Sequence, residues 1–210
     1  VTLKDVTAPV TPTLSDVNIG ECSGTPPAPT TTDICAGAIT GTTTTVFPIT
    51  AQGTTVVTWT FADGNGNSTT ADQNVIVDDI TKPSLSSIAN INENVGALCS
   101  FTIPDYRGLT TASDNCTAVG SIVKTQSPAI GTVISGHNTT QLITITADDG
   151  KGNIGTTTFT VTLKDVTKPV ITCPPSVTAN TDSDGTGNCT TKVSLGTPTA
   201  ADNCTTAGNF

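Results

Sequence analysis

The chain has 210 residues, a formal net charge of −9 and an aromatic content of only 3%. Its eight Lys and Arg residues are spread along the chain and form no basic stripe, so we expect no nucleic-acid partner. No apolar stretch approaches the ~20 residues that a membrane-spanning helix needs. Because the sequence begins with neither Met nor a signal segment, we expect an internal fragment of a longer protein.

Val, Ile and Thr are abundant and Met is absent, while Gly and Pro separate short apolar runs. This composition favours β-strands and turns over helices. Alternating apolar residues predict strands, in chain order, at 55–62, 69–77, 85–91, 99–103, 119–124, 141–147 and 156–163. The first two flank Asp63-Gly-Asn-Gly-Asn67, which predicts a hairpin with glycine at positive φ. Trp59, in the strand before that hairpin, is expected in the core.

Three motifs recur in one order along the chain. The segment 1–10 returns at 161–170 with one substitution, and a looser copy lies at 78–83. The hairpin motif 63–67 returns at 149–153, and Ser113-Asp-Asn-Cys116 returns as Ala201-Asp-Asn-Cys204, with a weaker relative at 32–35. These recurrences predict the end of one repeat (1–4), two whole repeats (5–78 and 79–164) and the N-terminal part of another (165–210).

Each whole repeat has room for seven short strands in about 80 residues and shows no helix signal. This pattern predicts an all-β fold of tandem immunoglobulin-like Greek-key β-sandwich repeats. Pro9, Pro83 and Pro169 leave almost no free linker between repeats and bias the preceding residues to extended backbone. We therefore expect the repeats to follow one another end to end.

The motifs resemble those of the hyalin-repeat group of immunoglobulin-like domains. The resemblance is carried by these segments: 57–60, 63–67, 165–169, 173–174, 195–199 and 201–204. The segments 126–132 and 158–169 are similar to versions in large cell-surface adhesins of gliding, Bacteroidota-type bacteria. The first two repeats depart from the pattern because they lack the Cys of its Cys-Pro element.

The resemblance implies a secreted or cell-surface protein and a mechanical, adhesive role as stalk repeats of an adhesin or extracellular fibre. Neighbouring repeats of the same chain are the expected partners. Lateral self-association in a fibre and contact with surface glycans or other cells are further partners that it allows. The alternative function is a glycan-binding module within the same surface array.

The cysteines predict disulfides, since Cys-x-x-Cys zinc spacing is missing and His137 is the only histidine. Disulfides place a protein outside the cytoplasm. The first repeat holds only Cys22 and Cys35 and the second only Cys99 and Cys116, so each pair is expected to close within its repeat or stay free. The alignment pairs Cys189 with Cys204, which leaves Cys173 to a partner beyond the chain.

Asp residues recur at corresponding positions of the repeats and predict calcium at the repeat junctions. In an immunoglobulin-like sandwich, the linker, the loop before Cys116 and the second hairpin meet at one end, and crowded carboxylates there favour Ca²⁺. The predicted ligands of the second repeat are Asp78, Asp79, Asp114, Asn115, Asp148, Asp149 and Asn153. Weaker equivalents are Asp5, Asp33 and Asp63 in the first repeat, where Ile34 replaces Asn, and Asp165 and Asp202 in the truncated one. Asp182 and Asp184 are expected at the opposite end. The competing interpretation is that these residues serve only turn geometry.

The sequence offers little catalytic machinery, so we expect no enzyme. His137 lies between Gly136 and Asn138 without a nearby nucleophile motif and is interpreted as a solvated loop residue. For the glycan-binding alternative, only Tyr106 beside Arg107 could supply an exposed aromatic platform. A loop that packs down is the competing interpretation of that Tyr.

Overall fold

The computed structural model describes residues 3–181, 185, 187, 189 and 191–205, so Asp182 and Asp184 lie outside the described residues. The chain divides into two compact units. The first unit comprises Val1–Leu85, Ala112–Lys124 and Ala147–Gly155. The second unit comprises Ser86–Thr111, Thr125–Thr146 and Thr156–Phe210. The predicted repeat 79–164 therefore contributes residues to both units.

The regular structure is almost entirely β. The first unit contains β1 (Val17–Asn18), β2 (Thr30–Asp33), β3 (Gly37–Thr40), β4 (Gly53–Ala62), β5 (Ser68–Val77), β6 (Ser84–Leu85), β9 (Ala112–Ser113) and the 3-10 helix η2 (Val119–Ser121). The second contains β7 (Ile91–Val95), β8 (Ser100–Thr102), the 3-10 helix η1 (Arg107–Leu109), β11 (Val133–Ser135), β14 (Val170–Thr172) and β15 (Thr199–Ala201). Three strands have residues in both units: β10 (Val123–Ser127), β12 (Thr140–Asp148) and β13 (Ile154–Asp165).

The all-β prediction is confirmed, and the described residues contain no α-helix. Within this described part, no helix is long and apolar enough to cross a membrane. The sheets have the strand orders β1-β5-β4 and β10-β12-β13-β7, with four further two-stranded pairs.

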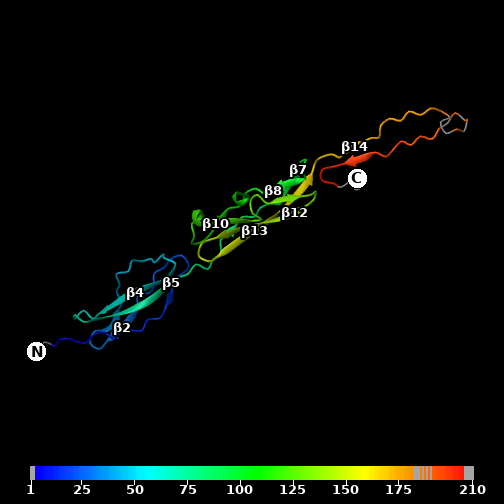
Figure 1. Cartoon of the computed structure of the whole chain (residues 1–210). Coiled ribbons are helices and arrows are strands. Elements are labelled where there is room, and N and C mark those ends of the chain that lie inside the picture. The colour runs from blue at the N-terminus through cyan, green and yellow to red at the C-terminus, as the bar shows by residue number, and fades with distance from the viewer. Residues whose placement is uncertain (1–2, 182–184, 186, 188, 190, 206–210) are drawn as a thin grey trace. The chain divides into compact units, whose positions relative to one another are not determined.

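The core of the first unit is built on the long antiparallel pair β4 and β5, which lie side by side in Figure 1. Alternate residues of β4 point inward, so that Val57, Trp59 and Phe61 are buried together with Val75 and Val77 of β5. The indole N–H of Trp59 donates a 3.0 Å hydrogen bond to Oε1 of Gln73. Trp59 is therefore a core residue, as predicted.

Two predicted strands differ from the structure. Of the segment 85–91, only the two end residues lie in strands: Leu85 ends β6, which pairs with β9, and Ile91 begins β7, which pairs with β13, while residues 86–90 form no strand. The segment 119–124 begins with η2, closed by a 2.8 Å hydrogen bond from Ser121 N–H to the carbonyl of Ala118. Apolar alternation could not distinguish these two segments from continuous strands.

The structure repeats itself where the sequence does. An early strand pairs in parallel with the last long strand in both repeats: β1 with β5, and β7 with β13. Both Gly-rich hairpins carry glycines at positive φ, at 80° and 103° for Gly64 and Gly66 and at 73° and 102° for Gly150 and Gly152. The predicted hairpin geometry is thus confirmed.

Candidate metal centre

Three aspartates of the first unit meet just beyond the ends of β5, β9 and β12. Asp79 follows β5 by two residues, whereas Asp114 and Asp149 directly follow β9 and β12. One carboxylate oxygen from each lies within 4.8 Å of the others. Asp79 and Asp149 are each only 4% exposed. The structure thus brings together three of the residues predicted to bind calcium, drawn from three separate stretches of the chain.

The hairpin between β12 and β13 holds Asp149 firmly. Its Oδ1 accepts hydrogen bonds from the N–H groups of Lys151 (2.7 Å) and Asn153 (3.1 Å). The side-chain amide of Asn153 donates to Oδ2 of Asp149 and to the carbonyl of Asp79, both at 2.8 Å. The side-chain amide N–H group of Asn153 therefore links Asp149 to Asp79.

Asp79 and Asp114 each use one carboxylate oxygen and leave the other unpaired. Oδ1 of Asp79 accepts from Thr81 N–H at 3.2 Å, and Oδ1 of Asp114 accepts from the N–H groups of Cys116 and Thr117 at 2.9 and 2.8 Å. Oδ2 of Asp79 and Oδ2 of Asp114 are buried without a hydrogen-bond partner. A buried, unpaired carboxylate oxygen is costly unless a proton or cation satisfies it.

The environments of these carboxylates push their ionisation in opposite directions. Burial raises the pKa of Asp79, and the charges of Asp114, Asp149 and Glu21 raise it further against one opposing hydrogen bond from Thr81. Burial also disfavours the charge of Asp149, but the hydrogen bonds from Lys151 and Asn153 outweigh burial and lower its pKa. The cluster therefore combines a carboxylate held ionised with one whose charge needs compensation.

These residues fit a hard divalent cation. Calcium takes six to eight oxygen ligands in flexible geometry, and carboxylates are its preferred protein donors. Asp79, Asp114 and Asp149 offer three carboxylates, two of them with an oxygen that the protein leaves unsatisfied. The turns account for the hydrogen bonds that Oδ1 of each residue accepts, but they give no role to the unpaired Oδ2 atoms of Asp79 and Asp114.

The other predicted ligands of this repeat lie around the cluster. Asp78 is exposed, and its N–H donates to the carbonyl of Gly20 at 3.1 Å. Asp148 accepts from Gly150 N–H at 2.7 Å in its own turn. The Asn115 side chain is exposed and donates to Glu21 at 2.8 Å.

Glu21 is the residue that sequence reasoning missed. Its Oε2 accepts from Thr81 Oγ1 at 2.6 Å and from Asn115 Nδ2 at 2.8 Å, and these two hydrogen bonds lower its pKa. A carboxylate oxygen of Glu21 also lies within 4.8 Å of a carboxylate oxygen of Asp79 and of the disulfide sulfur of Cys116. The repeat comparison could not reveal it, because Leu98 stands at the corresponding position before Cys99.

The first repeat contains a similar arrangement of Asp5, Asp33 and Cys35, whose ligand atoms lie within 4.8 Å of one another. Asp33 is 6% exposed and its Oδ2 is buried without a partner. Asp63 accepts from the backbone and side chain of Asn67, as Asp149 does from Asn153. Ile34 is 90% exposed, and Asp5, Asp33 and Cys35 come together although Ile34 replaces the Asn of the other repeats.

The last predicted repeat shows the same local geometry in the second unit. Oδ1 of Asp202 accepts from the N–H groups of Cys204 (2.9 Å) and Thr205 (3.0 Å). These backbone bonds are the main cause of the lowered pKa of Asp202, and a hydrogen bond with Asp165 contributes in the same direction. Asp165 and Asp202 are therefore in contact.

The disulfide pairs differ from those predicted. Cys22 is bonded to Cys116 and Cys99 to Cys204, with sequence separations of 94 and 105 residues. The predicted pairs Cys22–Cys35, Cys99–Cys116 and Cys189–Cys204 are thus wrong. Each observed bond instead joins one predicted repeat to the following one.

The positions of Cys22 and Cys35 along the first repeat explain the correction. Gly20, two residues before Cys22, accepts a hydrogen bond from the N–H group of Asp78, which follows the C-terminal end of β5, whereas Cys35 lies beside Asp5. Asp5 in turn contacts Asn67, at the opposite end of β5. A strand of ten residues spans about 30 Å. A disulfide requires Cα atoms within about 7 Å, so the two cysteines of one repeat cannot meet.

Alkylation of the native, non-reduced chain is expected to label Cys35 and Cys173, which are exposed and outside the two disulfides. The negative charge of Asp5, partial desolvation by the surrounding protein and the charge of Asp33 raise the pKa of the Cys35 thiol. Its labelling should therefore accelerate strongly as pH rises above the usual thiol range. Peptide mapping by mass spectrometry should recover Cys22 linked to Cys116. A peptide linking Cys22 to Cys35 would contradict the structure.

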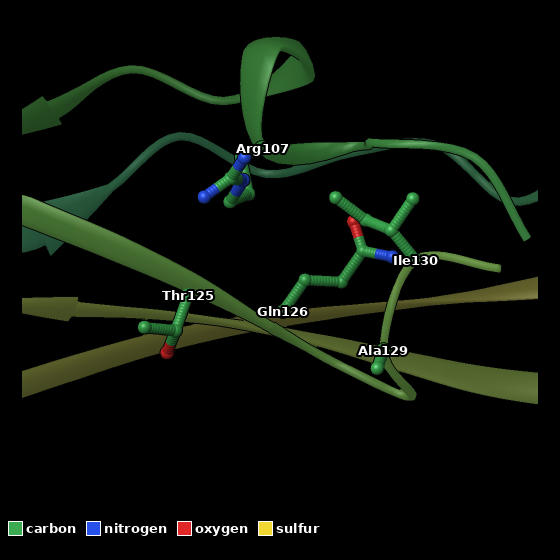
Figure 2. Close-up of a pocket in the computed structure, with 5 residues that line it drawn as sticks. All are labelled: Arg107, Thr125, Gln126, Ala129 and Ile130. Carbon is green, nitrogen blue, oxygen red and sulfur yellow. The ribbon is translucent and has the colours of Figure 1, made fainter. Parts of the chain in front are cut away.

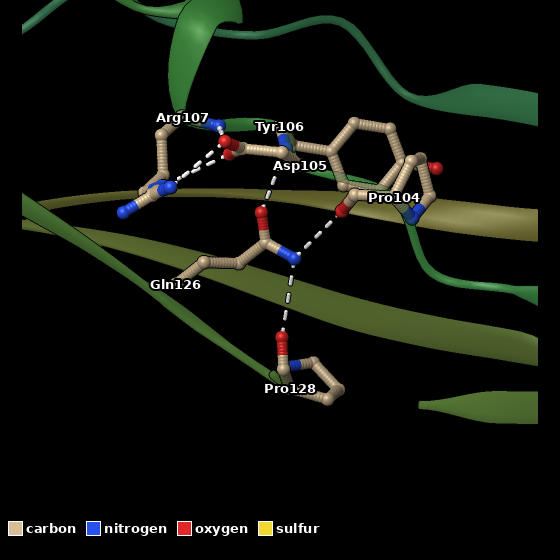
Figure 3. Close-up of polar contacts among 6 residues, drawn as sticks. All are labelled: Pro104, Asp105, Tyr106, Arg107, Gln126 and Pro128. Carbon is tan, nitrogen blue, oxygen red and sulfur yellow. Dashed lines mark hydrogen bonds and ion pairs between the residues drawn. The ribbon is translucent and has the colours of Figure 1, made fainter. Parts of the chain in front are cut away.

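Tyr106 does not provide an exposed platform for sugars. Its side chain is 4% exposed and packs edge-on against Phe159, with ring centroids 5.1 Å apart. Arg107 forms an ion pair with Asp105 at 2.9 Å, while Gln126 bonds to Tyr106 N–H and to the carbonyls of Pro104 and Pro128 (Figure 3). The adjoining shallow pocket is lined by Arg107, Thr125, Gln126, Ala129 and Ile130, none of them aromatic (Figure 2). The interpretation of this loop as one that packs down is confirmed.

Replacing Tyr106 by Phe is expected to leave stability unchanged or to raise it by up to about 1 kcal/mol. The Tyr106 hydroxyl is buried without a hydrogen-bond partner, and its removal abolishes that desolvation cost while the ring contact with Phe159 stays. Urea unfolding followed by far-ultraviolet circular dichroism measures the change. A loss of more than 1 kcal/mol would show that the hydroxyl makes a stabilising contact.

Comparison with known proteins gives one sequence relative and several solved structures. No family model matches the chain. The protocadherin gamma B2 extracellular cadherin domains 1–5 are 16% identical and cover 95% of this chain and 47% of their own, with a TM-score of 0.36. The human desmocollin-1 ectodomain is 11% identical and covers 80% and 43%, with a TM-score of 0.25. The chain is 32% identical over 161 residues to hyalin of Lytechinus variegatus, a similarity that covers 75% of this chain and 28% of hyalin.

Proposed function

We propose that this chain is a structural and adhesive segment of an extracellular surface protein, in which calcium stiffens the junctions between repeats. It carries no catalytic role in this proposal. The observation that carries it is the group of Asp79, Asp114 and Asp149, in which Asp79 and Asp149 are buried and Asp79 and Asp114 each have an unpaired oxygen; Asp79 begins the second predicted repeat. A bound cation would clamp the linker residue Asp79 to two loops of that repeat.

Two further observations support an extracellular, load-bearing role. The disulfides Cys22–Cys116 and Cys99–Cys204 are typical of oxidising compartments. Each adds a covalent cross-link between predicted repeats, which would resist their separation under tension. The similarity to hyalin agrees with the resemblance found in the motifs. Relation to adhesins of gliding bacteria stays a prediction from the sequence, as do the repeat boundaries and their end-to-end order.

Calcium would be held by side chains already organised for it. Asp149 is fixed by its hairpin, Asp114 by its turn before Cys116, and Asp79 by Thr81 and Asn153. When bound, the cation would supply the positive charge that satisfies Oδ2 of Asp79 and Oδ2 of Asp114. Extracellular modules of this kind bind calcium with dissociation constants of about 10⁻⁴ to 10⁻³ M.

Isothermal titration of the chain with calcium chloride tests the proposal. We expect binding in that range for the unmodified chain and a loss of at least tenfold in affinity at this site for Asp79→Asn, which keeps the size of the side chain and removes its charge. Asp72→Asn is the matched control, because Asp72 is exposed on β5 and contacts Thr58. Absence of calcium binding up to about 10 mM, ten times the weakest expected dissociation constant, would refute the proposed metal site.

A further inference from the structure

We propose that the Glu21 carboxylate is a fourth ligand of this metal centre and that the Cys22–Cys116 disulfide positions it. Calcium binding and the redox state of that disulfide are then linked. The inference rests on the proposed calcium function. It adds to the three aspartates a carboxylate that lies 58 residues before Asp79, in the preceding predicted repeat.

The contacts of Glu21 place its carboxylate beside the aspartate cluster. One of its oxygens lies within 4.8 Å of a carboxylate oxygen of Asp79 and of the disulfide sulfur of Cys116, and Asp79 is shared with the group of Asp114 and Asp149. Oε2 of Glu21 accepts from Thr81, two residues after Asp79, and from Asn115, next to Asp114. Glu21 thus touches the neighbours of two candidate ligands, and Oδ2 of Asp79, in a side chain only 4% exposed, has no partner within the protein.

Two connections hold Glu21 in place. Gln52 links it to Asp79: the Gln52 amide donates to the carbonyl of Glu21 at 2.6 Å, and its Oε1 accepts from Asp79 N–H at 2.9 Å. The disulfide links Glu21 to Asp114, because Cys22 is the next residue and Cys116 N–H donates to Oδ1 of Asp114. Only the second connection is covalent, and only it depends on redox conditions.

Linkage follows from this geometry. If the disulfide brings a fourth carboxylate to the cation, its reduction releases that carboxylate and weakens binding. By reciprocity, bound calcium must favour the oxidised form by the same factor. Coupling of this kind between two sites typically changes affinity about 5- to 150-fold. We expect a factor of at least about 5 here.

The second disulfide provides an internal comparison within the same chain. Cys99–Cys204 also joins predicted repeats and lies beside an Asp-Asn-Cys turn, but the residue before Cys99 is Leu98. Leu98 has no oxygen to offer in its side chain. Calcium should therefore favour the oxidised form of Cys22–Cys116 more than that of Cys99–Cys204.

The test equilibrates the folded chain in buffers of reduced and oxidised dithiothreitol, with calcium chloride or with chelator. Reduction of the disulfide moves two electrons and two protons from the dithiol to the cysteines, giving two thiols and the cyclic disulfide of the reagent. Alkylation and peptide mapping then give the oxidised fraction of each pair. We expect calcium to shift the equilibrium of Cys22–Cys116 at least about fivefold toward the disulfide. Trp59 fluorescence checks that the first unit stays folded.

Glu21→Gln removes the carboxylate without touching either disulfide, and Glu93→Gln, at the only other glutamate, is the matched control. We expect Glu21→Gln to bind calcium at least about fivefold more weakly and to lose the redox shift, and Glu93→Gln to behave as the unmodified chain. This inference is overturned, while the proposed function stands, if the unmodified chain binds calcium and Glu21→Gln binds it equally well. It is also overturned if the unmodified chain binds calcium but the redox equilibrium of Cys22–Cys116 is the same with calcium and with chelator. Failure of the unmodified chain to bind calcium would overturn the proposed function itself.

Discussion

Replacing Cys22 and Cys116 together by Ser is expected to lower the stability of the first unit by about 4 kcal/mol. The disulfide closes a loop of 94 residues, and the loop-entropy relation gives about 4 to 5 kcal/mol for a loop of this length. If only the first repeat unfolds, the closed loop runs from Cys22 to Asp79, and the same relation still gives about 4 kcal/mol. Urea unfolding monitored by Trp59, the only tryptophan, measures the difference because Trp59 is buried in the core of that unit.

Two controls separate the cross-link from the substitutions themselves. Cys173→Ser alters an exposed cysteine outside both disulfides and should not change the Trp59 transition. Replacing Cys99 and Cys204 by Ser removes a cross-link of the second unit and should leave that transition nearly unchanged. A loss below about 1 kcal/mol for the Cys22 and Cys116 pair would mean that the bond does not restrain the unfolded chain.

Much of the fold could be predicted because its signals are local. The β-favouring segments that flank the first Gly-rich motif predicted β4 and β5 to within two residues, and the Asp-Gly-x-Gly-Asn motif predicted hairpins whose glycines have positive φ. The break at residues 86–90 could not be predicted, because apolar residues continue through the segment that connects β6, paired with β9, to β7, paired with β13.

The aspartates of the candidate metal site could also be predicted, because each recurs at a fixed place in the repeat. The disulfides could not, since counting cysteines within a repeat ignores where along its length they lie. Cys22 and Cys35 sit near opposite ends of β5, and that separation appears only in three dimensions. Glu21 was missed for a related reason: it has no counterpart in the next repeat, where Leu98 occupies its place.

Calcium at 10 mM is expected to stabilise the unmodified chain by about 1.4 to 2.7 kcal/mol per site, if it binds with dissociation constants of about 10⁻³ to 10⁻⁴ M. The gain should shrink as pH falls into the carboxylate range, because protons then compete for the same oxygens. Thermal unfolding with calcium and with chelator, followed by Trp59 fluorescence, measures it.

Asp79→Asn should have opposite effects on the stability of the chain in chelator and in calcium. The pKa of Asp79 is raised in the folded protein, so without calcium its ionisation costs stability at every pH above its unfolded pKa. The Asn variant removes that cost and can still accept from Thr81, so in chelator at pH 7 it should be more stable than the unmodified chain. In calcium it should gain little and become the less stable of the two.

Asp149→Asn provides the contrast, since the pKa of Asp149 is lowered in the folded state. A lowered pKa means that this carboxylate stabilises the folded protein above its unfolded pKa, and that this contribution is lost as pH falls through its folded pKa. Asp149→Asn should therefore be less stable at pH 7 both in chelator and in calcium, whereas Asp79→Asn should be less stable only in calcium. If the aspartates served turn geometry alone, calcium would change the stability of neither variant relative to the unmodified chain. Asp79→Asn would then not change from the more stable chain in chelator to the less stable chain in calcium.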